Sequence, residues 1–375
     1  MTLRTPPFVA LVGLAIVLGG VAGGGWAVYR HQSRLSPSPV TIQAPSENES
    51  LGQPQEISPV ASVPAATSTN TPAQESSAKL LFVGDIMLDR GVRLRSVRAG
   101  TRSYPFLKLP EGWLAEPDFT IGNLEGPVTD QRRSPEKSID FLFDPEVLPA
   151  LKNQGFDAFS QANNHALDQG RLGYEDSVRR LREAGFLTFG HQVQDGPIAL
   201  ATSTVQGVRL AFLGWNTTDN PLDQTQARQA IQFAQQEADH VIAYVHWGPE
   251  YRDRPHANEV ALAHWLIDEG VDVVIGGHPH WVQGISTYKG KMIAWSLGNF
   301  VFDQDFSVPT KQGLALRLDI AQSTMRVELH PVRITLSQPE LEEGVAKQER
   351  LEALARISDL SLQDDVSRGV LSFDL

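Results

Sequence analysis

The sequence predicts an α/β fold. Between residues 79 and 337, helical patterns with one apolar face alternate with short apolar stretches rich in β-branched residues. Glycines stand near the ends of several helical patterns, and polar or charged residues follow several of the apolar stretches. Helices that alternate with short strands are typical of sheets covered by helices, so either a layered sandwich or a doubly wound sheet is expected.

The composition bounds the size of the domain and the classes of function. A chain of 375 residues can bury a large core. Its formal net charge of -12 and its pI near 5.3 argue against a nucleic-acid partner. The sequence has no cysteine, which excludes disulfides, thiolate zinc sites, a cysteine nucleophile and a lipid-modified cysteine anchor. A metal ion could therefore be held only by nitrogen and oxygen ligands.

Residues 1–34 are predicted to anchor the protein in a membrane. Residues 8–29 carry no charge and are mostly apolar. About 22 residues in a helix span a hydrocarbon core of ~30 Å. A signal peptide cleaved near Ala22 or Ala27 is the alternative, because small residues gather there. The charges on the two sides of the segment are nearly balanced, so they do not predict its orientation.

Three further regions follow the predicted anchor. Residues 35–78 are rich in Ser, Pro, Thr, Gln and Ala and poor in large apolar residues, which predicts a disordered linker. Residues 79–337 are expected to form the globular domain, and residues 338–375 an acidic helix and tail appended to it. A membrane segment, a spacer and a globular domain in this order describe a tethered protein.

The first half of the domain contains three predicted strands that each end in polar side chains. They cover residues 80–83, followed by Asp85, residues 119–121, followed by Asn123 and Glu125, and residues 157–160, followed by Asn164 and His165. A helix over residues 145–154 closes at a glycine. Asp85 could instead cap a following helix, but its place directly after a strand favours a ligand.

The second half of the domain repeats this arrangement. Its predicted strands cover residues 208–213, residues 241–245, followed by His246, residues 271–275, followed by His278 and His280, and residues 292–297, followed by Asn299. Predicted helices place Tyr174, Val178 and Leu181 on one face, then Ala227, Ile231 and Ala234 on one face, and then cover residues 258–269. Asp223 is placed to cap the second of these helices.

The residue types that follow the strands are those that bind divalent metal ions. In open α/β sheets, ligands collect at the carboxyl ends of the strands. A site of carboxylate, imidazole and amide oxygen without thiolate suits Mn²⁺, Fe²⁺, Mg²⁺ or Zn²⁺. His278 and His280 alone would be equally compatible with a solvated turn, but the other strand ends favour a metal or anion site.

Six motifs in this order resemble those of the CapA family of poly-γ-glutamate capsule synthesis proteins: GDIMLDR, IGNLEGPVT, ANNHALDQG, VHWGPEY, GGHPHWVQG and SLGNFVFDQ. The resemblance covers roughly residues 80–333. That family is regarded as a branch of the calcineurin-like metallophosphoesterase superfold. The resemblance therefore implies a layered α/β sandwich of metallophosphoesterase type, an N-terminal membrane anchor and an outward-facing domain.

The resemblance also implies ligands for one or two divalent ions. By position, one ion would be surrounded by Glu125, Asn164, His246 and His278, and a second by Asp85, Glu125 and His280. His165 matches the catalytic histidine and would act as a general acid. The sequence departs from the superfold at Met87, where a histidine is usual. A thioether is a poor ligand for a hard ion, so the second ion is expected to be weak or absent.

Substrate contacts are expected from residues close to the motifs. The forked donors of Arg90 could clamp a phosphate or a carboxylate, although a surface role is the alternative. Further substrate-binding candidates are Asn123, Glu250, Arg252 and Asn299. Of these, Glu250 and Arg252 lie on a charged loop that could simply be solvated, and Asn299 could be structural.

Two functions follow from these expectations. The first is a membrane-tethered, extracytoplasmic hydrolase of phosphoesterase type, metal-dependent, acting in poly-γ-glutamate synthesis or export. The second is a non-catalytic binding or assembly component whose pocket holds metal or polymer carboxylates. The expected partners are the membrane, through the N-terminal helix, an anionic polymer or phosphoester substrate, and other capsule synthesis subunits. The expected location is the cell membrane, as a single-pass protein with its domain outside the cytoplasm.

Overall fold

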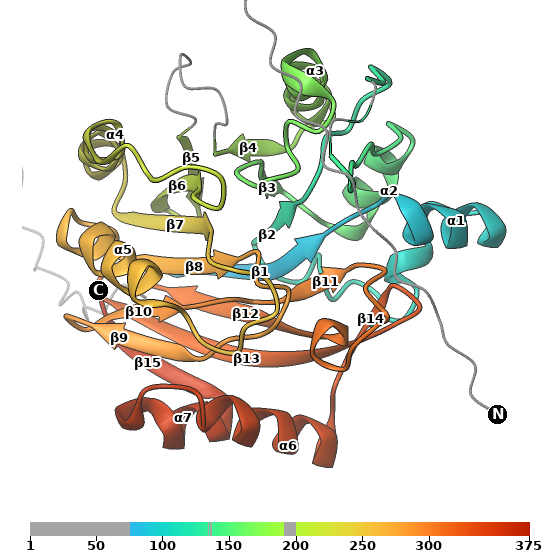
Figure 1. The fold of residues 1–375 in the computed structure, drawn as a ribbon. Helices are drawn as coiled ribbons and strands as arrows, with labels where there is room; N and C mark the ends of the chain where they lie inside the picture. Colours follow the sequence, from blue (N-terminus) through green and yellow to red (C-terminus); the bar gives the residue numbers. More distant parts are fainter. Residues whose placement is uncertain (1–75, 134, 136, 191–199) are drawn as a thin grey trace, which may run out of the picture. The chain divides into compact units, whose positions relative to one another are not determined.

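Two β-sheets pack face to face in the part of the chain that the computed structural model describes, and helices cover their outer faces (Figure 1). The described residues are 76–133, 135, 137–190 and 200–375. The predicted membrane anchor over residues 1–34 and nearly all of the predicted linker over residues 35–78 lie outside them. Within the described ranges, no helix has the length and apolar character needed to cross a membrane.

The first sheet is mixed and has nine strands in the described part of the chain, in the order β14, β13, β12, β1, β2, β3, β4, with β11 paired to β1 and β15 paired to β13. The strands are β1 (Ala78–Ile86), β2 (Phe119–Leu124), β3 (Ala158–Ser160), β4 (Leu187–Phe189), β11 (Asn299–Val301), β12 (Gln312–Ile320), β13 (Thr324–Thr335), β14 (Gln338–Leu341) and β15 (Val370–Asp374). β1 to β4 are parallel, and β12 to β15 pair antiparallel.

The second sheet has six strands in the described residues, in the order β5, β6, β7, β8, β10, β9. They are β5 (Ala201–Val205), β6 (Val208–Asn216), β7 (His240–His246), β8 (Val273–Gly277), β9 (Ile285–Tyr288) and β10 (Lys291–Ala294). The four inner strands are parallel, and the two edge strands pair antiparallel. The inner strands read as continuous apolar runs because both faces of this sheet are covered.

The first five helices pack on the outer faces of the sheets, and the last two pack against the central core. The helices are α1 (Arg90–Ala99), α2 (Val147–Gln154), α3 (Gly170–Glu183), α4 (Gln224–Glu237), α5 (Ala257–Asp268), α6 (Gly344–Ala355) and α7 (Gln363–Arg368), with short 3₁₀ helices η1 (Tyr104–Phe106), η2 (Pro309–Lys311) and η3 (Leu360–Leu362). The side chain of Asp223 accepts hydrogen bonds from the amides of Thr225 and Gln226. The predicted N-cap of α4 is therefore confirmed.

The core lies between the two sheets. It combines inward-facing side chains of β1, β12 and β13 with those of β6, β7 and β8, and Phe82 of β1 contacts Phe212 of β6 with ring centroids 6.5 Å apart. Two smaller apolar clusters separate the outer helices from the sheets. Burying one such side chain contributes roughly 1.5–3 kcal/mol. The arrangement of helices, sheet, sheet and helices confirms the layered sandwich rather than the doubly wound sheet.

The C-terminal region differs from the prediction of an appended helix and tail over residues 338–375. β14 pairs with β13 along Val332–Thr335, and β15 pairs with β13 along Thr324–Glu328. Leu371 and Phe373 of β15 are buried, and α6 and α7 pack against the central core. Residues 338–375 are thus an integral part of the first sheet, because alternate side chains of β15 face the core.

Candidate metal centre

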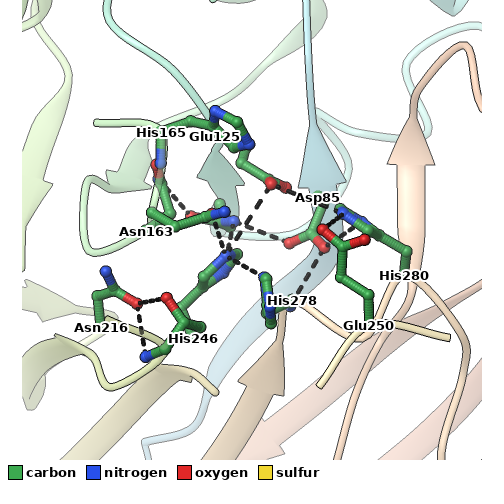
Figure 2. A network of polar contacts seen from close by, with 12 residues as sticks. Asp85, Glu125, Asn163, His165, Asn216, His246, Glu250, His278 and His280 are labelled. Atoms are coloured by element: carbon green, nitrogen blue, oxygen red, sulfur yellow. Dashed lines mark hydrogen bonds and ion pairs between the residues drawn. The ribbon is translucent and has the colours of Figure 1, made fainter. Parts of the chain in front are cut away.

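The carboxyl ends of two parallel strands from each sheet meet in one place. β1 and β2 end there in the first sheet, and β7 and β8 end there in the second. Figure 2 shows side chains from all four ends turned toward one another. Gly277 at the end of β8 permits this approach, since a Cβ atom on it would lie 3.0 Å from Oδ1 of Asp85. The structure therefore confirms that the residues at the strand ends converge.

Asp85 lies one residue before the end of β1 and is completely buried. Its Oδ1 accepts a hydrogen bond from Nδ2 of Asn123 at 2.8 Å, and its Oδ2 lies 3.3 Å from the amide of His278 and 3.4 Å from Nδ1 of His280. Asn123 was predicted to contact substrate. It is also completely buried, and its Oδ1 accepts from Asn163 at 3.0 Å, so it holds Asp85 in place from behind the cluster.

Glu125 follows β2 and lies at the centre of the cluster (Figure 2). Its carboxylate is completely buried, and neither of its oxygens has a hydrogen-bond partner within the described residues. Burial raises the pKa of Glu125 well above its usual range, and the Asp85 and Glu250 carboxylates raise it further. An unpartnered buried carboxylate is costly, so this position calls for a cation.

His246 ends β7, and His278 follows β8. Nε2 of His246 lies 3.1 Å from Nδ1 of His278, 2.9 Å from Oδ1 of Asn164 and 4.0 Å from Oε1 of Glu125. Burial lowers the pKa of His246 well below its usual value, and the neighbouring imidazoles lower it further. Burial likewise lowers the pKa of His278 to about 3. Both imidazoles are therefore neutral at physiological pH, which is the form that binds metals.

His280 is oriented by Asn299, whose Oδ1 lies 2.9 Å from Nδ1 of His280. Nε2 of His280 then faces Oε1 of Glu125 at 3.8 Å and Oε1 of Glu250 at 4.0 Å. Asn299, a predicted substrate contact, is completely buried and also donates to the Thr310 carbonyl. The geometry therefore favours a structural role for Asn299 over a substrate contact. Donating Nδ1–H in this way leaves the Nε2 lone pair free for an ion.

Three groups of donors in the described residues could each hold an ion, with one donor atom per residue within 4.8 Å of the others: Glu125, His246 and His278; Asp85, Glu125 and His280; and Glu250, His278 and His280. The first two match the carboxylate and imidazole members of the two ligand sets implied by the family resemblance. The donor types, the neutral imidazoles and the unpartnered Glu125 all fit a divalent ion. The residues present therefore suit such a group.

Backbone strain gathers around this cluster. Four residues beside it have positive φ although they are not glycine: Arg90 (47°), Tyr251 (61°), His278 (91°) and His280 (57°). Such conformations cost on the order of 1–3 kcal/mol each and persist where the surrounding structure holds them. The turn through Pro279 uses two of them to bring both histidines to the same side.

His165 lies on the loop after β3 and is held by Asp168, which was not among the predicted site residues. Nδ1 of His165 lies 2.6 Å from Oδ2 of Asp168, whose side chain is completely buried. Asp168 also accepts from the amide of Phe141 and from Lys137. The motif that contains His165 also contains Asp168 three residues later, and that spacing was the available signal. With Nδ1–H given to Asp168, Nε2 of His165 is left to exchange a proton.

Arg90 is partly exposed and forms an ion pair with Asp303. Its guanidinium lies 5.0 Å from the ring centroid of Phe141 and 5.8 Å from that of Phe302. Asp303 also accepts from the amide of Gly91, so the pair is fixed to the start of α1. The guanidinium of Arg90, which was predicted to clamp an anion, is thus held by Asp303.

Two other residues lie outside the cluster. Arg252 is exposed, and its carbonyl accepts a hydrogen bond from Gln283, so the contacts of the described residues do not bring its side chain to the donors. Met87 is completely buried in the apolar cluster beneath α1, and its sulfur accepts from the Asp89 amide. Position 87 supplies no ligand, as its side-chain chemistry predicts.

The fold and the cluster define a class: four-layer α/β sandwich proteins with a buried carboxylate and histidine site suited to divalent ions. The chain belongs to the family described as "Bacterial capsule synthesis protein PGA_cap", whose model matches residues 79–304. The predicted family is confirmed.

Two relatives named CapA agree with this membership. The chain is 30% identical to the PGA biosynthesis protein CapA of Bacillus subtilis over 315 residues, which cover 78% of this chain and 81% of that protein. It is 31% identical to the capsule biosynthesis protein CapA of Bacillus anthracis over 284 residues, which cover 69% and 68% of the two chains.

Solved structures are more distant. A hypothetical protein from Thermus thermophilus has 19% identity and a TM-score of 0.40, and covers 70% of this chain and 95% of its own. A novel phosphatase from Mycoplasma pneumoniae has 11% identity and a TM-score of 0.42, and covers 72% and 92%. Neither likeness supports a conclusion about the chemistry of this chain.

Proposed function

We propose that this protein is a membrane-tethered, metal-dependent hydrolase of phosphoesterase type that acts in poly-γ-glutamate synthesis or export. The membership of the family supports the process. The donor cluster supports the chemistry, and the apolar segment of residues 8–29 supports the tether.

The observation on which the proposal rests is the position of Glu125. Its unpartnered carboxylate belongs to two of the three donor groups, one with His246 and His278 and the other with Asp85 and His280. Glu125 would therefore help to hold an ion in either group. Divalent ions held there would supply Lewis-acid polarisation of an anionic ester, chemistry that the side chains alone lack.

The chain's own residues would bind and orient the substrate. Arg90 lies at the site with its guanidinium fixed by Asp303 and stacked near two phenylalanine rings, and it would hold an anionic oxygen. His165, fixed through Nδ1 by Asp168, would give a proton from Nε2 to the leaving oxygen. Phe141 packs on His165 with ring centroids 4.1 Å apart and restricts water on that side.

The test uses the full-length protein purified from membranes. Bound metal would be counted after treatment with EDTA and reloading with Mn²⁺, and hydrolysis of p-nitrophenyl phosphate and of its bis-ester would be followed. We expect the variants Asp85→Asn and His278→Ala to lose metal and to lose about 10²-fold or more of kcat/KM. Asp253→Asn, an exposed acid on the loop after β7, is the matched control.

The alternative function is a non-catalytic component that uses the same pocket to hold metal or polymer carboxylates. Met87 favours it, because a ligand is missing beside Asp85. Tight metal binding with no turnover of either ester would support this alternative and overturn the hydrolase. A protein that binds no metal would overturn the hydrolase and would leave only the binding of polymer carboxylates.

The location is a separate part of the proposal. A domain outside the cytoplasm requires the segment of residues 35–75 to be cut by protease added to spheroplasts. Protection of that segment until the membrane is permeabilised would overturn the extracytoplasmic placement. That result would not affect the hydrolase proposal, which the metal-binding and hydrolysis measurements test.

A further inference from the structure

The donors around His280 that come from the strand ends leave at least one position of an ion open. Asp85, Glu125 and His280 form one group, with one donor atom from each. Divalent ions of the types that suit this site take at least four ligands. Met87, two residues beyond Asp85, faces an apolar cluster and contributes none. The fourth position could be filled by water or by a side chain from another element.

Glu250 lies on the loop after β7 and forms a donor group with His278 and His280. Its Oε1 lies 4.0 Å from Nε2 of His280, and Oε1 of Glu125 lies 3.8 Å from the same nitrogen. Two donor atoms at ~2.1 Å from one ion stand about 3.0–3.4 Å apart. The observed separations exceed this range by less than 1 Å, which a side-chain adjustment can close. Figure 2 shows the Glu250 carboxylate reaching toward His280.

The backbone holds this loop against the histidine turn. The amide of Tyr251 donates to the carbonyl of Pro279 at 2.9 Å, and the amide of Trp247 donates to the carbonyl of Gly277 at 3.2 Å. Tyr251 has the positive φ of 61° that turns the chain at this point. Glu250 is thus fixed relative to His278 and His280 at both ends of its loop.

We propose that Glu250 is a ligand of the second ion, together with Asp85, Glu125 and His280. The inference rests on the proposed metal site and adds to it the donor that completes the set. Asp85, Glu125 and His280 are buried, whereas the side chain of Glu250 is 39% exposed. Glu250 would therefore be the ligand of the second ion that is most accessible to solvent.

The experiment compares Glu250→Gln with Asp253→Asn, which removes the same charge from the same exposed loop. The full-length, EDTA-treated proteins would be titrated with Mn²⁺ by calorimetry, and the electron paramagnetic resonance of the loaded proteins would be recorded. We expect two Mn²⁺ per wild-type chain and a spin-coupled signal. In Glu250→Gln, the affinity for the second ion should fall at least tenfold, and the coupled signal should disappear. Asp253→Asn should match the wild type.

The outcomes separate this inference from the proposed function. A Glu250→Gln protein that binds two ions with wild-type affinities would overturn the role of Glu250. A wild-type protein that binds one ion, equally well without the Glu250 carboxylate, would also overturn it and would leave a mononuclear site. A wild-type protein that binds no Mn²⁺ would overturn the metal site itself. Equal melting temperatures of all three proteins in EDTA would show that the substitutions leave the fold intact.

Discussion

Nε2 of His246 and Nδ1 of His278 face each other at 3.1 Å in the buried centre of the site. Burial lowers the pKa of both imidazoles, in His278 to about 3. Neutral imidazoles this close to an unpartnered carboxylate form a site that is ready for a cation and costly without one. The stability of the metal-free protein is therefore the most direct measure of how the site is built.

The metal-free protein is expected to lose stability as the pH falls from about 6.5 toward 3. The unfolded chain takes up a proton on His278 near pH 6.5, whereas in the folded chain its pKa is about 3. The unfolded state therefore binds more protons in this window, and acid favours it. Replacing His278 by Asn should reduce the decline by up to about 1.4 kcal/mol per pH unit. Urea unfolding in EDTA at several pH values measures both slopes, and identical slopes would contradict the prediction.

The variant Glu125→Gln is expected to stabilise the metal-free protein. Glu125 has no hydrogen-bond partner among the described residues and a raised pKa. A raised pKa contributes stability at low pH that is lost as the pH rises, so the gain should be largest at pH 8. Removing the charge should add about 1–3 kcal/mol to the free energy of unfolding in EDTA.

The same Glu125→Gln variant should gain less from Mn²⁺ than the wild type does. Denaturant unfolding with and without Mn²⁺ measures this difference. Glu111→Gln, at an exposed position, is the control. A Glu125→Gln protein less stable than wild type in EDTA would show that the carboxylate has a partner outside the described contacts.

The variant Asn299→Ala is expected to weaken metal binding, although Asn299 itself is not a ligand. Asn299 accepts from His280 and fixes which nitrogen of that ring is free. Loss of such a partner typically costs 10–100-fold in metal affinity. Mn²⁺ titration of the EDTA-treated protein is the measurement. Unchanged affinity, with an unchanged melting temperature, would mean that His280 is held by the turn alone.

Leu371→Ala tests the place of the last strand in the fold. Leu371 of β15 is 1% exposed, and Leu360 of η3 is 86% exposed. Truncating the buried leucine should cost about 2–5 kcal/mol, and truncating the exposed one no more than about 0.5 kcal/mol. Denaturant unfolding of the two variants gives the comparison. Equal costs would show that β15 is not needed by the sheet.

Much of the site can be predicted from the sequence, because the ends of the strands can be recognised where apolar runs stop. Asp85, His246 and His278 each come directly after an apolar run, and parallel strands deliver their ends to one edge. The sequence does not show that β1 and β7 belong to different sheets. Their meeting depends on face-to-face packing of the sheets through residues such as Phe82 and Phe212.

The roles of the asparagine side chains were harder to predict than those of the carboxylates and histidines. Asn123 lies one residue before the end of β2 and Asn299 begins β11, and their side chains turn to Asp85 and His280. Rotamers and hydrogen bonds decide this, and a sequence pattern does not contain them. β15 was missed although Leu371 and Phe373 alternate with polar residues, because a five-residue alternation is short.

The pairing of the first sheet has a consequence for how the chain is made. Ala78 lies opposite Ile320, and Thr324 lies opposite Asp374. The strand that begins the domain thus pairs with one near its end, and the final strand occupies the last residues. A ribosome must synthesise the residues up to Ile320 before β1 can complete its pairing with β12. Contacts so distant in sequence slow folding, and during synthesis the apolar face of β1 would stay exposed to other chains.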